Sequence, residues 1–268
     1  MSVAVEQPRA SWVEPVRLLV VRTGALAIVE LQKLRHDNTE LITRMVQPVL
    51  WLLVFGQIFS RIRAIPTGDL SYLEYLTPGI LAQSALFVSI FVGIQIIWDR
   101  DAGILTKVMV TPTPRAAIVL AKAFSAGIRG LAPVVILVPL SLLLGVAITV
   151  NPLKLIAAAV ALMLGAGFFA CLSMAIAGVA QARDRLMGIG QLMTMPLFFA
   201  SNALYPIEIM PGWLQVISQI NPLTYLVNAL RGLLVGAPAN LWADFGVLLA
   251  AAVVGVAGAS RLMGRLVR

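Results

Sequence analysis

The amino-acid sequence predicts an all-α membrane protein with six transmembrane helices, and three observations lead to this class. Four stretches carry no charged residue over 22 to 28 positions, namely 75–98, 130–153, 155–182 and 186–207. A helix needs about 20 apolar residues to cross a bilayer core about 30 Å thick, and a soluble domain rarely contains several such stretches. The composition agrees, because 60% of the residues are hydrophobic and only 12% are charged. Finally, the basic residues lie at the ends of the apolar stretches, as the positive-inside rule expects.

The first 40 residues are expected to form a cytoplasmic segment that contains an interfacial helix at 24–37. Its apolar residues would share one face and its charged residues the other, the two groups being Ala27, Ile28, Leu31 and Leu34, and Glu30, Lys33 and Asp37. A simple N-terminal membrane anchor would have the same pattern, so both interpretations remain open. The segment lacks the apolar core of a signal peptide, and no cleaved export signal is expected.

The transmembrane domain is expected to occupy 41–268. Its spans are predicted at about 41–60, 76–97, 126–149, 155–180, 186–204 and 242–262. The first is the shortest, because only 16 residues separate Arg44 from Arg61, and Arg44 would have to extend its charge to the interface. A further apolar stretch at 209–230 is interrupted by Pro211-Gly212 and Asn221-Pro222. Proline disfavours helix at the preceding residue, so this stretch predicts two short helices and no seventh span.

The distribution of basic residues favours six spans with both termini in the cytoplasm. That topology places fifteen Lys and Arg residues on the cytoplasmic side and four on the other, namely Arg61, Arg63, Lys154 and Arg231. Arg129 is expected at the start of the third span. A seventh crossing would move three arginines of the C-terminal tail outside, against the usual bias. The sequence thus predicts a multi-pass protein of the plasma or inner membrane.

The predicted spans lack the chemistry of an ion-coupled carrier or an enzyme. Carriers usually keep ionisable groups on the transport path, whereas every acidic residue here is expected in a loop, in a tail or near a span end. A single histidine, His36, and a single cysteine, Cys171, do not build a metal site. The chain has neither the His-Glu-x-x-His and Gly-x-Ser-x-Gly motifs nor a phosphate-binding glycine loop. We therefore expect no catalytic residue, metal or bound cofactor, and the energy for uphill transport would come from another polypeptide.

The longest internal cytoplasmic connection, at 98–115, contains a short amphipathic segment. It opens with acidic groups, which suit the positive end of a helix dipole. Its apolar residues then recur at helical spacing, and two Thr-Pro pairs end the pattern: Ile104, Leu105, Val108 and Met109, then 111–112 and 113–114. Two interpretations stay open. The segment could lie on the lipid headgroups, or it could dock as a helix in a groove of a soluble partner.

Two motifs together resemble type-2 ATP-binding-cassette (ABC) export permeases. An acidic-Arg-acidic-x-Gly-x-Leu segment at 99–105, followed by Thr-Pro at 111–112, resembles the cytoplasmic coupling helix of that family. The second motif combines 204–206 (Leu-Tyr-Pro), 210–214 (Met-Pro-Gly-Trp-Leu), 221–225 (Asn-Pro-Leu-Thr-Tyr) and 229–232 (Ala-Leu-Arg-Gly). It resembles the family's segment between spans five and six, and the resemblance extends over essentially the whole chain. The nearest relatives would be daunorubicin-resistance-like permeases and other multidrug or lipid exporters.

The sequence departs from the family pattern at three positions. Family members usually carry Glu where this chain has Asp99 and Asp101, and Thr where it has Ile104. The substitutions keep the charge pattern and the apolar face. They therefore affect the detailed contacts with a partner more than the expected role of the segment.

The resemblance implies a permease subunit that pairs with a second copy or a homologous permease and binds two separate ABC ATPase subunits. ATP and Mg would be held by those subunits. The contact with the ATPase would be made by Asp99, Arg100, Asp101, Gly103, Ile104, Leu105, Val108, Thr111 and Pro112. The 205–231 segment would form short re-entrant helices at the external exit, with gate residues Pro206, Pro211, Trp213, Asn221, Pro222, Tyr225 and Arg231. Arg231 is expected at the outer interface, paired with an acidic neighbour or a lipid phosphate.

An amphipathic drug or lipid is the expected cargo, because Met and Phe side chains supply an adaptable apolar surface. The path is expected to include Gln57, Gln83, Phe87, Gln191 and Asn202. Polysaccharide or glycolipid export is the alternative, since such relatives share the same body. Two other classes make different predictions: a secondary carrier would transport without an ATPase, and a lipid-modifying enzyme would depend on a loop carboxylate or on His36. No nucleic-acid partner is expected, because the net charge of +8 is spread over the span ends.

Overall fold

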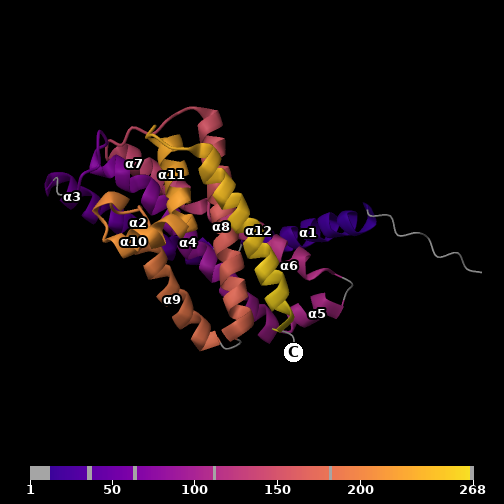
Figure 1. The fold of residues 1–268 in the computed structure, drawn as a ribbon. Helices are drawn as coiled ribbons and strands as arrows, with labels where there is room; N and C mark the ends of the chain where they lie inside the picture. Colours follow the sequence, from indigo (N-terminus) through magenta and orange to yellow (C-terminus); the bar gives the residue numbers. More distant parts are fainter. Residues whose placement is uncertain (1–12, 35–37, 63–64, 111–112, 181–182, 266–268) are drawn as a thin grey trace, which may run out of the picture.

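The computed structural model describes residues 13–34, 38–62, 65–110, 113–180 and 183–265, and Figure 1 presents the fold. Every regular element in these ranges is a helix, which confirms the all-α class. The elements are α1 (Val13–Leu34), α2 (Asn38–Leu50), a π-helix (Trp51–Phe55), α3 (Gly56–Ile62), α4 (Tyr72–Asp101), α5 (Ile104–Val110), α6 (Arg115–Arg129), α7 (Ala132–Leu143), α8 (Pro152–Ala180), α9 (Arg183–Phe199), a 3-10 turn (Ile207–Ile209), α10 (Gly212–Ile220), α11 (Pro222–Leu234), α12 (Leu241–Leu262) and a final 3-10 turn (Met263–Arg265).

Four helical segments within the described ranges are long and apolar enough to cross a membrane. They are Tyr72–Asp101, Arg115–Leu143, Pro152–Ala180 and Leu241–Arg265. Three correspond to the spans predicted at 76–97, 155–180 and 242–262. The other two predicted spans, 41–60 and 186–204, remain predictions as membrane crossings. The first of these is α2, the π-helix and α3 in succession, and the second is α9, whose apolar part covers only Gly188–Phe199.

The span predicted at 126–149 begins and ends earlier than its charges indicated. The helical segment starts at Arg115, turns at Gly130–Leu131 between α6 and α7, and ends at Leu143. Arg129 is therefore buried in the middle of this segment instead of marking its start. The prediction failed because a charged residue was taken as a helix boundary, whereas Lys122 and Arg129 both face the protein interior.

Helix α4 lies at the centre of the bundle, and two glycines allow its neighbours to approach closely. A side chain at Gly93 would collide with Ser173 of α8, whose hydroxyl donates a hydrogen bond of 2.7 Å to the Ile90 carbonyl. A side chain at Gly79 would collide with the backbone of Ala203, just after α9. Among the four candidate spans, the apolar part of α4 is 83% buried and that of α12 only 11%. Helix α4 is thus fixed within its own chain, while α12 faces outward.

The two ends of the bundle carry different segments. At one end, Gly178 near the end of α8 lies against Leu262, and Gly264 lies against Arg115 at the start of α6. Helix α5 and the C-terminal end of α12 lie at this end in Figure 1. At the other end, the Thr149 amide donates a hydrogen bond of 2.8 Å to the Leu234 carbonyl at the end of α11. We call these the α5 end and the α11 end.

Helix α1 is longer than the interfacial helix expected at 24–37, and its faces differ from the expected ones. It runs from Val13 to Leu34 and packs against α6. Ala27 and Ile28 were assigned to one apolar face and Glu30 to the opposite, polar face, but Ala27 is 7% exposed and so lies on the buried side with Glu30. Ile28 is 59% exposed, whereas Glu30 is 7% exposed. The reason is a buried ion pair, described below, that draws Glu30 into the protein.

Candidate functional site: the α5 segment and the α9–α11 segment

Helix α5 is a separate short helix because the chain turns sharply after α4. Helix α4 ends at Asp101, and Gly103 adopts a positive φ of 70°, a left-handed conformation that glycine takes at little cost. The Gly103 amide donates a hydrogen bond of 2.9 Å to the Arg100 carbonyl, which closes the turn. Ile104 through Val110 then form the short helix predicted by the spacing of the apolar residues. Thr111 and Pro112, which were also predicted to contact a partner, lie outside the described residues.

The apolar residues of α5 point in two directions. Leu105 is 3% exposed and belongs to the hydrophobic core, so it supports α5 from beneath. Ile104 is 44% exposed, and Val108 is half-buried. Of Ile104, Leu105 and Val108, Ile104 is therefore the residue that a partner protein can reach most directly.

The charged residues before α5 also separate into an outer and an inner group. Arg100 donates a hydrogen bond of 2.9 Å to the exposed Asp101 carboxylate. Asp99 instead faces inward, where its Oδ2 lies 2.5 Å from Nζ of Lys122 on α6. The same ammonium donates a 3.1 Å hydrogen bond to Oε1 of Glu30 on α1. Asp99 thus links α4 to α6 and α1, a role that differs from the surface contact implied by the resemblance.

Sequence reasoning missed Lys122 because it was counted among the cytoplasmic loop residues. Lys122 is 4% exposed in the structure, and two carboxylates neutralise its ammonium group. One signal was available: Lys122 is the single charged residue in the stretch 116–128. Long charged residues are almost never fully buried unless they are paired, so an isolated lysine on an apolar helix points to an internal partner.

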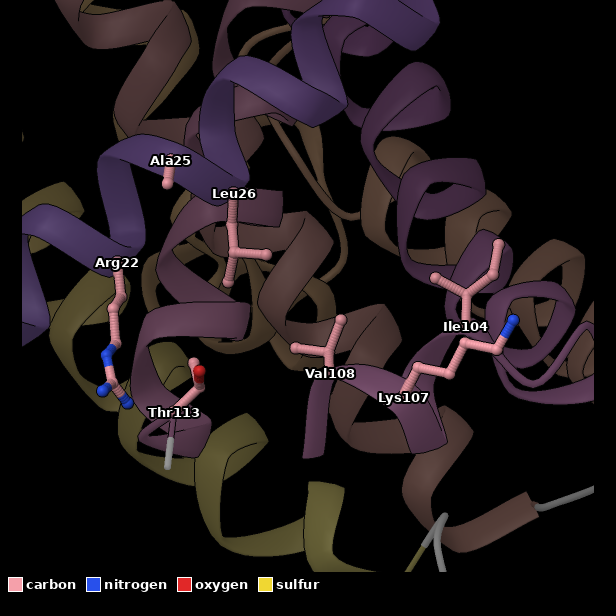
Figure 2. Close-up of a pocket in the computed structure, with 7 residues that line it drawn as sticks. All are labelled: Arg22, Ala25, Leu26, Ile104, Lys107, Val108 and Thr113. Carbon is pink, nitrogen blue, oxygen red and sulfur yellow. The ribbon is translucent and has the colours of Figure 1, made fainter. Parts of the chain in front are cut away.

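A groove opens between α1 and α5, as Figure 2 shows. Its volume is about 340 Å³. It is lined by Arg22, Ala25 and Leu26 of α1, by Ile104, Lys107 and Val108 of α5, and by Thr113. In Figure 2, Leu26 and Val108 face each other across the groove, while the guanidinium of Arg22 extends toward Thr113. The outward side of α5 is therefore continuous with one side of α1.

The α9–α11 segment contains two short helices because polar groups and prolines interrupt it. Asn221 ends α10 and caps α11, its Oδ1 accepting a 3.0 Å hydrogen bond from the Leu223 amide. Its Nδ2 donates to the Leu197 carbonyl at 2.7 Å, which ties both short helices to α9. Pro222 occupies the first turn of α11, where its missing N–H leaves no acceptor unsatisfied. Two helices thus lie where the sequence predicted them, while their re-entrant position in the membrane remains a prediction.

Arg231 is buried, contrary to its expected position at the outer interface. It is 7% exposed, and its Nη2 donates to the Asn202 and Tyr75 carbonyls at 2.9 and 3.2 Å. Its guanidinium also stacks 3.7 Å from the centre of the Tyr75 ring. The physical reason is the break after α9, which leaves the Asn202 carbonyl without a helical donor, and Arg231 and the Tyr75 hydroxyl both donate to it. Within the described ranges, no carboxylate forms an ion pair with this arginine.

The remaining predicted gate residues surround this break at different depths. Trp213 is 68% exposed, Pro211 is also exposed, and Pro206 is half-buried. The Tyr225 hydroxyl donates to the Gln219 carbonyl at 2.6 Å and so joins the end of α10 to α11. The nearby Tyr205 hydroxyl donates to the Phe199 carbonyl at 2.7 Å. Burial raises the pKa of Tyr205 above its usual value, further from neutral pH.

The residues predicted to line a substrate path do not form one surface in the single chain. Gln83 and Asn202 are buried, Phe87 is half-buried, and Gln57 is exposed. Asn202 belongs to the cluster around Arg231, where its Nδ2 donates to Oδ1 of Asn228 at 2.5 Å. The side chain of Gln191 lies outside the described residues. Their role in transport therefore stays a prediction.

The apolar spans and the absence of strands within the described residues define a multi-pass helical membrane protein. Comparison with known proteins then identifies its family. The family model "ABC-2 type transporter" matches residues 22–235, and the chain belongs to this family of transport permeases. The match includes α5 and the whole α9–α11 segment.

Individual relatives support the same assignment. The chain is 32% identical over 202 residues to the putative transport permease ycf38 of Cyanophora paradoxa, covering 74% of this chain and 69% of the relative. It is 27% identical over 234 residues to the daunorubicin resistance ABC transporter permease protein DrrB1 of Streptomyces coeruleorubidus, covering 87% and 81%. A probable doxorubicin resistance ABC transporter permease protein DrrC of Mycobacterium tuberculosis is 26% identical over 223 residues, covering 83% and 80%.

Proposed function

We propose that this chain is the membrane permease of an ABC exporter and that separate ATPase subunits drive it by binding at α5. Family membership supports a transport permease, and the lack of a phosphate-binding glycine loop supports an external source of energy. The observation that carries the proposal is the position of α5. A seven-residue helix leaves the central helix α4 through a glycine turn and exposes Ile104 beside charged residues.

Fewer residues would contact the ATPase than the sequence motif contains. Ile104 would be the apolar anchor, and Arg100, Asp101 and Lys107 would surround it with charge. Leu105 and Asp99 would hold α5 in place from the inner side, because one is buried and the other binds Lys122. A push on α5 would then pass to α4, α6 and α1 together. ATP and Mg would remain on the partner.

The connectivity supports a proposed topology of six spans. Glu30 binds Lys122 of α6 near the α5 end, and Tyr72 donates to the Leu204 carbonyl near the α11 end. The segment between these two residues therefore has to cross from one end of the bundle to the other. The segment between Gly178 and Leu234 also has to cross from the α5 end to the α11 end. Helices α2–α3 and α9 lie in these segments and would be spans one and five. We propose that both termini and α5 lie on the cytoplasmic side of the plasma or inner membrane.

Pairing with a second permease completes the proposal. The central helix α4 is largely buried by its own chain, so a path for a large solute is better formed between two chains. Two-fold assemblies are the commonest closed oligomers, and the partner would be an identical or homologous permease. The α9–α11 segment would then close the external exit, with Arg231 holding it against α4.

An amphipathic drug or lipid is the proposed cargo. Two of the relatives carry daunorubicin or doxorubicin resistance in their names, and the spans of this chain present mainly apolar side chains. Polysaccharide or glycolipid export is the second candidate. The two are distinguished by measuring ATP-dependent movement of a fluorescent anthracycline and of a labelled lipid-linked glycan in the same vesicles.

Docking at α5 is tested by Ile104→Asp. A carboxylate at the centre of an apolar contact should weaken association with the ATPase subunit by at least about tenfold, the scale of an interface hot spot. Co-elution of the purified permease with its ATPase, followed by ATP-dependent export in vesicles, measures the effect. Ile217→Asp on α10 is the matched control, because Ile217 and Ile104 are 46% and 44% exposed.

Three results would count against the proposal. Undiminished association and export by the Ile104→Asp variant would exclude α5 as the docking site. An equal loss of ATPase association in the Ile217→Asp variant would indicate general damage to the fold. Export by the isolated permease, in vesicles with an ion gradient and without an ATPase, would instead identify a secondary carrier.

A further inference from the structure

Asp244 is a buried acidic residue in the first turn of α12, at the α11 end of the bundle (Figure 1). It is 4% exposed, and its carboxylate is hydrogen-bonded by the side chain of Asn228 on α11. Oδ1 of Asn228 accepts a hydrogen bond of 2.5 Å from Nδ2 of Asn202, and the Asn202 carbonyl accepts one from Arg231. Asp244 therefore belongs to a polar network that joins α12 to α11 and to the break after α9.

Two oxygen atoms of this network lack a hydrogen-bond donor. Oδ2 of Asp244 and Oδ1 of Asn202 are both buried, and neither has a partner among the described residues. The two side chains are connected through the same amide, that of Asn228. Buried polar atoms are hydrogen-bonded in the great majority of proteins, so these oxygens indicate that the network needs a further donor.

The negative charge of Asp244 also lacks a cation. Within the part of the chain that the structure describes, no ion pair includes this carboxylate. Lys154 at the start of α8 is exposed, and Arg231 is held by two backbone carbonyls and the ring of Tyr75. The ionisable residues on the elements that pack most closely against α12 are Tyr225 and Arg231 of α11, Lys154 and Cys171 of α8, Arg115, Lys122 and Arg129 of α6, and Arg265 of the final 3-10 turn.

A bound proton would meet both requirements. A protonated carboxyl group carries no charge and has an O–H donor, while its other oxygen still accepts. A carboxylate buried without a cation is costly, and such a group becomes neutral in practice. A divalent metal ion fits less well, because it takes several oxygen ligands, and the described residues contain no group of three or more His, Cys, Asp or Glu side chains that could hold one.

We propose that Asp244 binds a proton when α12 is packed against α11. The carboxyl O–H then donates within the network, and its other oxygen keeps the hydrogen bond from Asn228. Movement of α12 away from α11 would expose the group to water, where an aspartic acid is ionised at neutral pH. Opening of this end would therefore release the proton, and low pH would favour the closed arrangement. The site goes beyond the proposed function, because proton binding requires neither the ATPase nor the cargo.

Infrared spectroscopy of the purified permease in detergent tests the site. A protonated carboxyl group has a C=O stretching band that a carboxylate lacks. At about pH 5.5, where an aspartic acid in water is largely ionised, we expect this band in the unmodified chain and its loss in Asp244→Asn. Asp69→Asn is the matched control, because Asp69 is exposed, and this variant should keep the band. Labelling aspartate with carbon-13 at the carboxyl carbon should shift the band of the unmodified chain, an assignment that needs no substitution.

Thermal unfolding gives an independent measurement. The folded chain holds the proton more tightly than the unfolded chain, so raising the pH from about 4 to about 8 should destabilise the unmodified chain relative to Asp244→Asn. Asp69→Asn should follow the unmodified chain over the same range.

Three results would overturn the proposal. Absence of the band from the unmodified chain at about pH 5.5 would show that Asp244 is ionised. A band that persists in Asp244→Asn, or that does not shift on aspartate labelling, would assign the proton to another group. Identical pH dependence of unfolding in the unmodified chain and in Asp244→Asn would show that packing of α12 is not linked to proton binding.

Discussion

Lys122 joins three helices through a single ammonium group. Its partners are Glu30 of the N-terminal helix α1 and Asp99 at the end of the central helix α4, and both lie far from Lys122 in the sequence. Buried ion pairs contribute little net stability, because desolvation offsets much of the attraction, yet removing one member leaves the other charges buried and unpaired. The residue therefore matters more for fixing the relative positions of α1, α4 and α6 than for net stabilisation.

Replacing Lys122 with methionine should destabilise the permease by about 3–5 kcal/mol, because Glu30 and Asp99 would both lose the ammonium that they share. Unfolding of the purified protein in detergent, followed by circular dichroism, measures this change. Lys107→Met is the control, since Lys107 is exposed and has no ion pair among the described residues. A triple variant that also carries Glu30→Gln and Asp99→Asn should recover part of the loss. Equal stability of Lys122→Met and Lys107→Met would contradict the inferred role.

Sequence reasoning succeeds at residues whose structure is set locally and fails at residues whose partners are distant in the sequence. Pro211-Gly212 and Asn221-Pro222 predicted two short helices correctly, because proline geometry and helix capping act locally. Asp99, Lys122 and Arg231 were placed at surfaces, but all three face the interior. Their positions depend on partners 23 to 156 residues away in the sequence, and no local pattern reports such contacts.

At the scale of elements, α5 is distinguished by the turn that precedes it. Gly103 has a positive φ, and a Cβ atom added there would meet nothing within 4 Å. The position therefore demands a left-handed backbone and imposes no steric limit from neighbouring residues. A side chain at this position would act only through backbone strain. Substitutions of Gly103 therefore test whether the turn sets the orientation of α5.

Gly103→Val should destabilise the turn by about 1–2 kcal/mol and weaken ATPase association, because a β-branched residue resists the left-handed conformation. Gly103→Asn should be much milder, since Asn adopts this conformation more readily. Co-elution with the ATPase subunit and thermal unfolding are measured for both variants. Similar values for Val and Asn would indicate that the turn does not control the orientation of α5.

The boundaries of the elements could be predicted where composition changes and not where packing decides. Helices α4, α8 and α12 stand out as long apolar stretches, and the structure contains them. The break between α6 and α7 has a local signal that the prediction did not use, because Gly130 ends α6 and Pro133 lies in the first turn of α7. The π-helix at Trp51–Phe55 has no comparable signal, and it depends on how neighbouring helices pack, which a single sequence does not display.

At the scale of the whole molecule, the proposed six-span topology follows from which ends of the helices meet. Cysteine labelling tests it in a Cys171→Ala background. A membrane-impermeant maleimide should reach Lys107→Cys and Arg265→Cys from one side and Ile217→Cys from the other. Labelling of all three from one side, or of residue 265 from the same side as residue 217, would exclude the topology.

The glycine contacts of α4 restrict how this protein can switch. Ser173 packs against Gly93 at one level of the helix, and Ala203 packs against Gly79 about four turns away. These two close contacts oppose sliding and rotation of α4 against α8 and the end of α9. In the proposed pair of permeases, each chain would therefore move as a rigid body, and the passage for cargo would open and close at the interface between the two chains.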